Sequence, residues 1–337
     1  MALTASQYPV RAPEWALTYA GANLTGRIDK MVTEIVYTDH FHGQAGDVEV
    51  KLEDRRHLWQ GAWFPVQGDL LELFIGYVGE SQLDCGDFQV DDLELEGPPD
   101  VFTIRAIPAY ITPSLRTPRS IGYEQQTLLQ VANTIAAKHG MTVVGAPNTI
   151  NVMFRRVTQN RETDLAFLKR LANENDYDFT IRDDKIQFYS RVLLRQRPPV
   201  LTIQRTDLEK FQFKSKTNQI YKAAEVSYND PTTGKLITGS ATAVVPVPTG
   251  DTLRLARRAE SGPDATQKAN AALRLHNMIY GTSNLTVPGN ILLVAGNNIA
   301  VSGFGKYDAT YYIMTARHKL SRDNGYSTEL ELQRLPN

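Results

Sequence analysis

The sequence predicts an α+β protein that is mainly β, with an α/β segment between two strand-rich segments. Stretches of alternating apolar and polar residues recur toward both ends, whereas apolar residues at helical spacing are confined to three stretches. Turn-forming residues separate the alternating stretches, as at Gly97-Pro98-Pro99, Asn229-Asp230-Pro231 and Asn324-Gly325. Many short strands punctuated in this way are typical of a sandwich or barrel.

Four strands are the clearest. Residues 47–53 place Val48, Val50 and Leu52 on one face of a strand. Residues 71–75 and 101–105 alternate in the same way, and residues 327–332 form another short strand late in the chain.

Two helices are predicted in the central part, over residues 127–139 and 162–173. Thr127 and Gln130 have the spacing of a capping box at the start of the first helix, and Gly140 is a stop signal after it. Each helix carries one apolar stripe: Leu128, Val131, Ala132 and Ile135 in the first; Leu165, Leu168, Leu171 and Ala172 in the second.

A third helix is predicted over residues 265–278, with Asp264 as its N-cap. Its apolar face is rich in alanine, which allows close packing on a partner surface. With these helices placed, Thr117-Pro118 and Arg197-Pro198-Pro199 read as joints. The 337 residues then divide into three domains: 1–117, 118–197 and 198–337.

The two strand-rich ends resemble each other. Gly68–Gly76 and Gly296–Gly303 each consist of a glycine turn, an apolar strand and a second glycine. An aromatic strand follows in both, at residues 88–90 and 311–314, and a long hairpin partner follows that, at residues 101–106 and 328–332. This order predicts an internal duplication, so that one chain would carry two similar barrels. The alternative is that any two barrel segments share glycine turns and alternation.

Charge and cysteine content exclude several classes of protein. There are 36 Lys plus Arg against 37 Asp plus Glu, a net charge of −1, so neither a basic excess nor a basic stripe indicates specific nucleic-acid binding. The pairs Arg55-Arg56 and Arg257-Arg258 read as solvated surface or local ion pairs. Cys85 is the one cysteine, and without a basic neighbour in sequence it reads as a passive thiol. No signal peptide or membrane anchor is recognisable, so we expect synthesis in the cytoplasm and a soluble chain.

No motif indicates catalysis, a cofactor or a metal. Asp39-His40-Phe41-His42 contains a His-x-His pair without a third ligand nearby, so a polar loop is predicted there instead of a metal site. The acidic stretch Asp84–Asp100 lacks the spacing of a calcium loop and reads as a solvated strand edge. Gly303-Phe304-Gly305-Lys306 fails the phosphate-loop pattern, because Tyr307 follows and the context is strands.

An ordered set of stretches covers roughly residues 30 to 335: 52–54, 65–69, 76–77, 86–91, 115–119, Gln159–Ala172, 301–305, Tyr312, His318 and 325–328. This set resembles the late control protein D family, the baseplate hub of contractile phage tails and R-type tailocins. One departure is Thr163, where serine is more usual; it leaves helix capping intact.

The resemblance implies a homotrimer with two tube-like β-barrel domains per subunit and an inserted middle α/β domain. The trimer would form a pseudo-six-fold ring that joins the six-fold tail tube to the three-fold central spike, at the tube tip of a virion or tailocin. Its further partners would be other baseplate proteins and the tape-measure protein. The structural positions that the family motifs imply are Asp54, Gly68, Asp69, Gly76, Phe88, Gln159, Asp164, Phe167, Leu168, Gly303, Gly305, Tyr312, His318 and Gly325.

Two alternatives stay open. The first is a hub of the type VI secretion spike, whose fold is related; because those chains usually continue into a fused spike, an end at Asn337 favours a phage or tailocin hub. The second is a tail-tip protein that acts on peptidoglycan through residues 121–190, with Glu162, Asp164, Glu174 and Asp176 as candidate acids.

Overall fold

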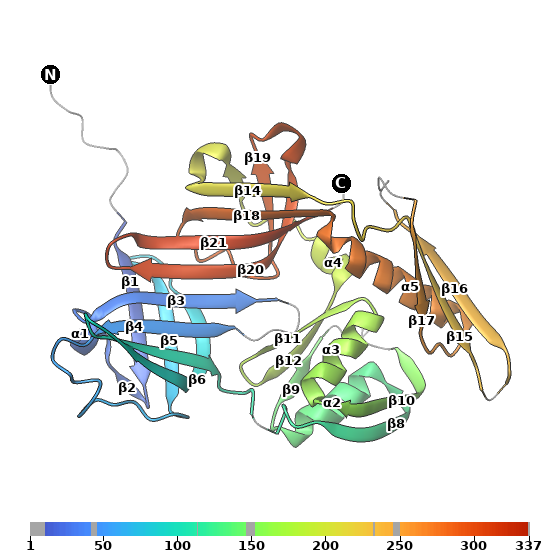
Figure 1. Ribbon diagram of the computed structural model, residues 1–337, viewed down its shortest axis with the longest axis horizontal. Helices are drawn as coiled ribbons and strands as arrows, with labels where there is room; N and C mark the ends of the chain where they lie inside the picture. The colour runs from blue at the N-terminus through green and yellow to red at the C-terminus, as the bar shows by residue number, and fades with distance from the viewer. Residues whose placement is uncertain are drawn as a thin grey trace.

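The structure is a computed structural model that describes residues 11–41, 46–112, 114–145, 152–231, 233–244 and 250–335. Within these residues the fold is mainly β, which confirms the predicted class, and its largest element is a sheet of 13 strands (Figure 1). The strands of this sheet are β1 Pro13–Tyr19, β2 Ala22–Asn23, β3 Val32–His40, β4 Asp47–Glu53, β5 Leu70–Tyr77, β6 Leu83–Glu96, β7 Val101–Pro108, β13 Thr202–Gln204, β14 Lys210–Ser215, β18 Gly281–Pro288, β19 Asn298–Ser302, β20 Ala309–Ser321 and β21 Gly325–Arg334.

Alternation places these strands as the sequence predicts. Val48, Val50 and Leu52 of β4 are all buried, and so are the alternate apolar residues of β5. The sheet runs from β14 through β18, β21, β20, β3, β4, β7, β6 and β5 to β1 and β2, and β19 with β13 branches from β20. Burial of one face in each half yields two apolar cores, because side chains along a strand alternate between the faces.

The sheet consists of two units with the same strand order. The first unit is β1-β5-β6-β7-β4-β3, and the second unit is β13-β19-β20-β21-β18-β14. Gly68 and Gly296 hold equivalent turns, each with φ +93°. The Gly68 N–H donates to the Val90 carbonyl (2.8 Å), and the Gly296 N–H donates to the Ile313 carbonyl (2.9 Å). These matches support the predicted duplication. One difference is that β1 is antiparallel to β5, whereas β13 is parallel to β19.

The two units share one sheet because β3 of the first pairs with β20 of the second, from Glu34 opposite Ser321 to His40 opposite Thr315. Figure 1 shows this junction across the middle of the sheet. Closure of each unit into a tube-like barrel, and the division at residues 117 and 197, stay predictions.

The middle insert follows β7 and precedes β13. Thr127 begins α2 with the predicted capping box, and Thr163 accepts a hydrogen bond from the Ala166 N–H at the start of α3. Both apolar stripes face a shared core. The elements of the middle insert are β8 Arg119–Thr127, α2 Leu128–Lys138, β9 Thr142–Val144, β10 Met153–Glu162, α3 Asp164–Glu174, β11 Tyr177–Arg182, β12 Lys185–Ser190 and α4 Arg191–Arg195.

A second insert lies between β14 and β18 and was not foreseen as a separate sheet. It comprises β15 Ala223–Asn229, β16 Leu236–Thr242, β17 Thr252–Ala256 and α5 Gly262–Asn277, with a core of its own. The predicted alanine face is confirmed: Ala265 packs so closely on Gly239 that a Cβ there would lie 2.7 Å from the Ala265 Cβ.

The predicted N-cap of this helix was wrong. Ser261 caps α5 by accepting a hydrogen bond from the Asp264 N–H (3.3 Å). Pro263 lies in the first turn, where the backbone N–H that proline lacks would have no partner within the helix. The Asp264 carboxylate instead accepts from the Glu260 N–H (2.8 Å). Figure 1 shows the two inserts on the same side of the molecule, and an ion pair between Arg274 and Asp176 (3.1 Å) links them. In the described part of the chain, the remaining helical turns are α1 Thr25–Ile28 and the 3-10 turns Arg205–Asp207, Met278–Tyr280 and Gly305–Tyr307.

Candidate functional site

The motif glycines lie in turns of the large sheet, with one exception. Gly68, Gly303, Gly305 and Gly325 all have positive φ, between 64° and 93°, where other residues are strained. Gly76 is the exception. It lies in β5 without a positive φ, and a Cβ there would lie 3.1 Å from the Ser81 carbonyl oxygen. Close approach of the backbone is therefore what favours glycine at this position.

The motif aspartates Asp54 and Asp69 organise loops of the first unit. The buried Asp54 carboxylate accepts hydrogen bonds from the Leu58 N–H (2.8 Å) and the Trp59 N–H (3.2 Å), which fixes the turn after β4. The Asp69 carboxylate accepts from the Tyr19 hydroxyl (2.5 Å). Both side chains satisfy polar groups that the loops would otherwise leave unpaired.

A buried polar network surrounds Asp164 at the start of α3. One carboxylate oxygen accepts from Gln159 Nε2 (2.8 Å), and the other contacts His139 Nε2 (2.9 Å). Gln159 also donates to the Glu162 carbonyl (2.9 Å), and both Gln159 and Asp164 are fully buried. The network connects β10, α2 and α3, so these motif residues act inside the middle insert.

The other candidate acids also have basic partners. Glu162 and Glu174 both form ion pairs with Arg170, at 3.1 Å and 3.3 Å. Asp176 pairs with Arg274 of the second insert, and burial raises the pKa of Asp176. The four carboxyl groups therefore hold helices and inserts together.

The apolar motif residues are core positions. Phe167 and Leu168 are fully buried in the middle insert. Phe88 packs edge-on against Tyr37 in the first unit, with ring centroids 6.1 Å apart. Tyr312 packs edge-on against Phe41 (5.6 Å), where α4 meets the second unit. These contacts are those of structural side chains.

His318 lies fully buried where β3 meets β20. The Tyr326 hydroxyl contacts Nδ1 (2.7 Å) and Nε2 contacts the Leu293 carbonyl (3.1 Å), and the ring stacks on Tyr37 at 6.0 Å. A neutral imidazole fits both contacts, with Nε2–H donating and Nδ1 accepting. Burial lowers the pKa of His318 to about 4.

This burial predicts a pH dependence of folding. An unfolded histidine, with a pKa near 6.5, takes up a proton before the folded one does, so stability decreases as pH falls from about 6.5 toward 4. We expect His318 to contribute about 3 kcal/mol of this loss, from the pKa difference. The measurement is urea unfolding at pH 7.5 and pH 4.5 on the wild type and on His318→Gln. The variant should lose less stability between the two pH values, and equal losses would contradict the assignment.

Two other features of the sequence have plain structural positions. Asp39 and His40 end β3, so the predicted polar loop was wrong for them, because their backbone pairs with β20; His42 lies outside the described residues. Cys85 is buried, and burial raises the pKa of its thiol.

Among the described residues no group of three or more His, Cys, Asp or Glu could hold a metal ion. No helix in the described ranges is long and apolar enough to cross a membrane.

Sequence reasoning missed the contact that fixes the middle insert to the large sheet. Arg182, at the end of β11, donates to both carboxylate oxygens of the buried Asp39 (3.1 and 3.2 Å), and the Ala295 N–H donates to the same carboxylate (3.0 Å). Burial raises the pKa of Asp39, while Arg182 opposes that rise. Alternation alone could have singled out Asp39 as a charged residue at a strand end, but not its partner.

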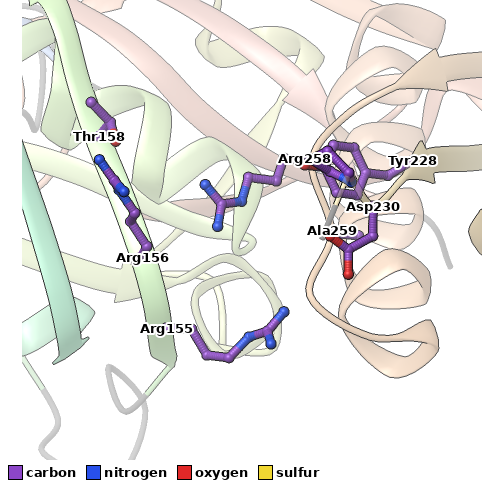
Figure 2. A pocket seen from close by; sticks show the side chains of 8 residues that line it. Arg155, Arg156, Thr158, Tyr228, Asp230, Arg258 and Ala259 are labelled. Carbon is purple, nitrogen blue, oxygen red and sulfur yellow. The ribbon is translucent and has the colours of Figure 1, made fainter. Parts of the chain in front are cut away.

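An arginine-lined groove of about 530 Å³ separates the two inserts. Figure 2 shows Arg155 and Arg156 on one wall and Arg258 on the other, beside Tyr228 and Asp230. The Glu260 carboxylate of the second insert links the two inserts by accepting from the Arg155 N–H (3.0 Å) and the Arg156 N–H (3.2 Å). Arg258 itself is exposed at the groove, as expected for a solvated surface position of the Arg257-Arg258 pair.

Within the described residues, several strand edges of the large sheet have one partner each, among them β2, β13, β14 and part of β6. β14 ends the sheet and pairs there with β18 only. The part of β6 from Asp92 to Glu96 pairs with β7 only, because β5 reaches no further than Gln89. The prediction of a solvated strand edge in Asp84–Asp100 therefore holds for this half of β6. Unpaired edge strands are templates for another chain. β14 and this half of β6 hold the places in the repeat that β3 and β20 hold at the junction of the two units, so these two edges are the candidate functional surface.

The curated relatives that match are tail proteins of two phages. The chain is 28% identical over 206 residues to a probable baseplate hub protein of Escherichia phage 186 and 27% identical over 216 residues to a probable baseplate hub protein of Escherichia phage P2. The matches cover 60% and 63% of this chain and 52% and 55% of those proteins, so the chain spans about half the length of the relatives it matches. No family model matches the sequence.

The fold is shared with solved phage tail structures. A tail protein of Neisseria meningitidis MC58 superposes with a TM-score of 0.72 at 15% identity, over 96% of this chain and 97% of that one. A 43 kDa tail protein of prophage MuSo2 from Shewanella oneidensis gives the same score and identity, over 96% and 98%. A component of the Escherichia coli type VI secretion system gives 0.57 at 13%, over 91% and 74%. The resemblance to the late control protein D family is thereby confirmed: the chain is similar in sequence to phage baseplate hub proteins and has the fold of phage tail proteins.

Proposed function

We propose that this chain is a baseplate hub of a contractile tail, a homotrimeric ring of pseudo-six-fold symmetry between the tail tube and the central spike. The observation that carries the proposal is the repeated strand order. Two similar units already pair side by side through β3 and β20 within one chain. Three chains would supply six such units, which suits a ring that faces a six-fold tube on one side and a three-fold spike on the other.

The relatives support this role. Both phage proteins are named as probable baseplate hub proteins, and sequence similarity to them favours a phage tail over a type VI secretion spike, for which only the fold is shared. On this proposal the ring is assembled into the tail with the tube, spike and tape-measure proteins as neighbours. Its described side chains act by packing and pairing, and the candidate acids of the middle insert serve as ion-pair partners.

The test is the native mass of the purified chain, alone and with its neighbouring spike protein. Three copies of 37.7 kDa give about 113 kDa, and we expect that species to take up a spike trimer. A trimer that forms only with the spike would also support the hub, with assembly templated by the spike. A monomer under both conditions would contradict the proposal.

A further inference from the structure

We propose that the free edge of β14 pairs antiparallel with the free half of β6, residues 92–96, in the next copy of this chain. The register would be the one that β3 and β20 already form within each chain. The inference rests on the proposed ring of copies and names the strands that close it. It follows from the internal repeat, because β14 is equivalent to β3 and β6 is equivalent to β20.

The first step is the match between β6 and β20. Pairing of β6 with β7 shifts register between Val90 and Asp92, and pairing of β20 with β21 shifts between Ile313 and Thr315. Asp92 is therefore equivalent to Thr315. The N-terminal halves of both strands pair with an equivalent neighbour, β5 or β19, while only the C-terminal half of β20 has a further partner, β3.

The second step is the match between β3 and β14. Tyr37 of β3 lies opposite Val48 of β4, and Phe213 of β14 lies opposite Ser283 of β18. Val48 and Ser283 occupy the same place in the repeat, opposite Ala106 and Leu332. The packing agrees: the Tyr37 and Phe88 rings are 6.1 Å apart, and the equivalent Phe213 and Tyr311 rings are 6.0 Å apart.

The third step applies the residue pairs of the β3–β20 junction to the equivalent residues of β14 and β6. Within the chain, Thr38 lies opposite Arg317, and His40 lies opposite Thr315. The same register between copies places Lys214 opposite Glu94, and Lys216 opposite Asp92. Tyr37 opposite His318 becomes Phe213 opposite Leu95. In each of these two charged pairs, a lysine therefore lies opposite a carboxylate.

The chemistry of the two edges agrees with this register. β14 and its continuation carry Lys210, Lys214 and Lys216, whereas the free half of β6 carries Asp92, Glu94 and Glu96. Opposite charges across antiparallel strands stabilise pairing and fix register. The edges also expose apolar side chains: Phe211 and Leu95 each have 47% of their surface exposed. The β3–β20 junction within the chain is stabilised by contacts of the same kinds: an ion pair between Lys319 and Glu34 (2.6 Å) and the stacked rings of Tyr37 and His318.

Charge reversal tests the pairing. Lys214→Glu and Glu94→Lys should each weaken self-association about tenfold or more, because each places like charges opposite one another. Association is measured by sedimentation equilibrium at low salt, with the spike protein present where the wild type associates only with it. The double variant should restore association to within a few-fold of the wild type, even though Glu94 also contacts Arg105 (2.7 Å). Lys235→Glu, an exposed residue of the second insert, is the matched control and should change nothing. Single variants that associate like the wild type, or a double variant no better than the singles, would overturn the pairing.

Disulfide trapping tests the register and is sensitive even to a transient contact. Lys214→Cys combined with Glu94→Cys should give covalent dimers and trimers on a non-reducing gel, and Lys214→Cys combined with Glu72→Cys should not, because β5 pairs on both sides. Equal cross-linking in both variants, or none in the first, would overturn the proposal. A trimer by native mass that does not cross-link would leave the hub standing and reject this pairing. A chain that stays monomeric with its spike protein would reject the hub itself.

Discussion

Replacing Arg191 by methionine is expected to lower the free energy of unfolding of the middle insert by about 3–5 kcal/mol, the usual cost of removing one partner of a buried ion pair. The Arg191 side chain is fully buried at the start of α4. Its Nε donates to Asp178 (2.7 Å) and its Nη2 donates to Asn173 (2.6 Å). Methionine fills much of the volume but removes the 2.7 Å ion pair of the Asp178 carboxylate, which is only 4% exposed.

The measurement is urea unfolding followed by far-UV circular dichroism, with amide hydrogen exchange of β11 and α4 to locate the loss. Arg254→Met is the matched control. Its ion pair with Glu225 (3.3 Å) joins side chains that are 80% and 53% exposed, so the change should stay below about 1 kcal/mol. An Arg191→Met protein as stable as the control would mean that the Asp178 carboxylate finds another partner or a proton at no cost.

Much of the fold follows from local sequence patterns. Alternation of apolar and polar residues identified strands such as β4 and β5, because one face of each strand is buried and successive side chains point to opposite faces. The capping box of Thr127 and Gln130 placed α2 correctly because cap and partner lie three residues apart. Asp264 was misassigned because any short polar residue near the start of a helix fits the N-cap preference. Only the structure shows that Ser261, three residues earlier, is the N-cap.

Strand pairing could not be read from the sequence. That β3 lies beside β20, some 275 residues further along, depends on which edges remain after each unit has formed. The second insert was hidden for a similar reason. Its strands alternate like those of the large sheet, and only the packing of α5 on β16 shows that they form a separate layer.

The candidate surface was also only partly recognisable from the sequence. The acidic stretch from Asp84 was recognisable as a solvated edge, because charged residues at alternate positions exclude burial of both faces. Lys214 and Lys216 carried no signal, since lysines at a strand end are common. They gain meaning only once β14 is seen to occupy the place in the second unit that β3 occupies in the first.

Replacing Phe167 by alanine is expected to cost about 3–5 kcal/mol, which is typical of a buried phenylalanine. The ring is fully buried in the core of the middle insert. It stacks on Tyr123 with centroids 5.6 Å apart, and the Arg170 guanidinium lies 5.2 Å from its centre. Alanine would leave a cavity between α3 and β8 and remove both contacts.

The chain offers a built-in control for where this loss occurs. Its three tryptophans, Trp15, Trp59 and Trp63, all lie in the first unit or its loops, so their fluorescence reports on that unit, whereas hydrogen exchange of α2 and α3 reports on the middle insert. If the insert unfolds as a separate cooperative segment, Phe167→Ala should speed exchange in α3 and leave the tryptophan transition in place. Phe167→Leu, which keeps most of the volume, should lose much less. A tryptophan transition that shifts by the full amount would show instead that Asp39 and Arg182 couple the insert to the sheet strongly enough for both to unfold together.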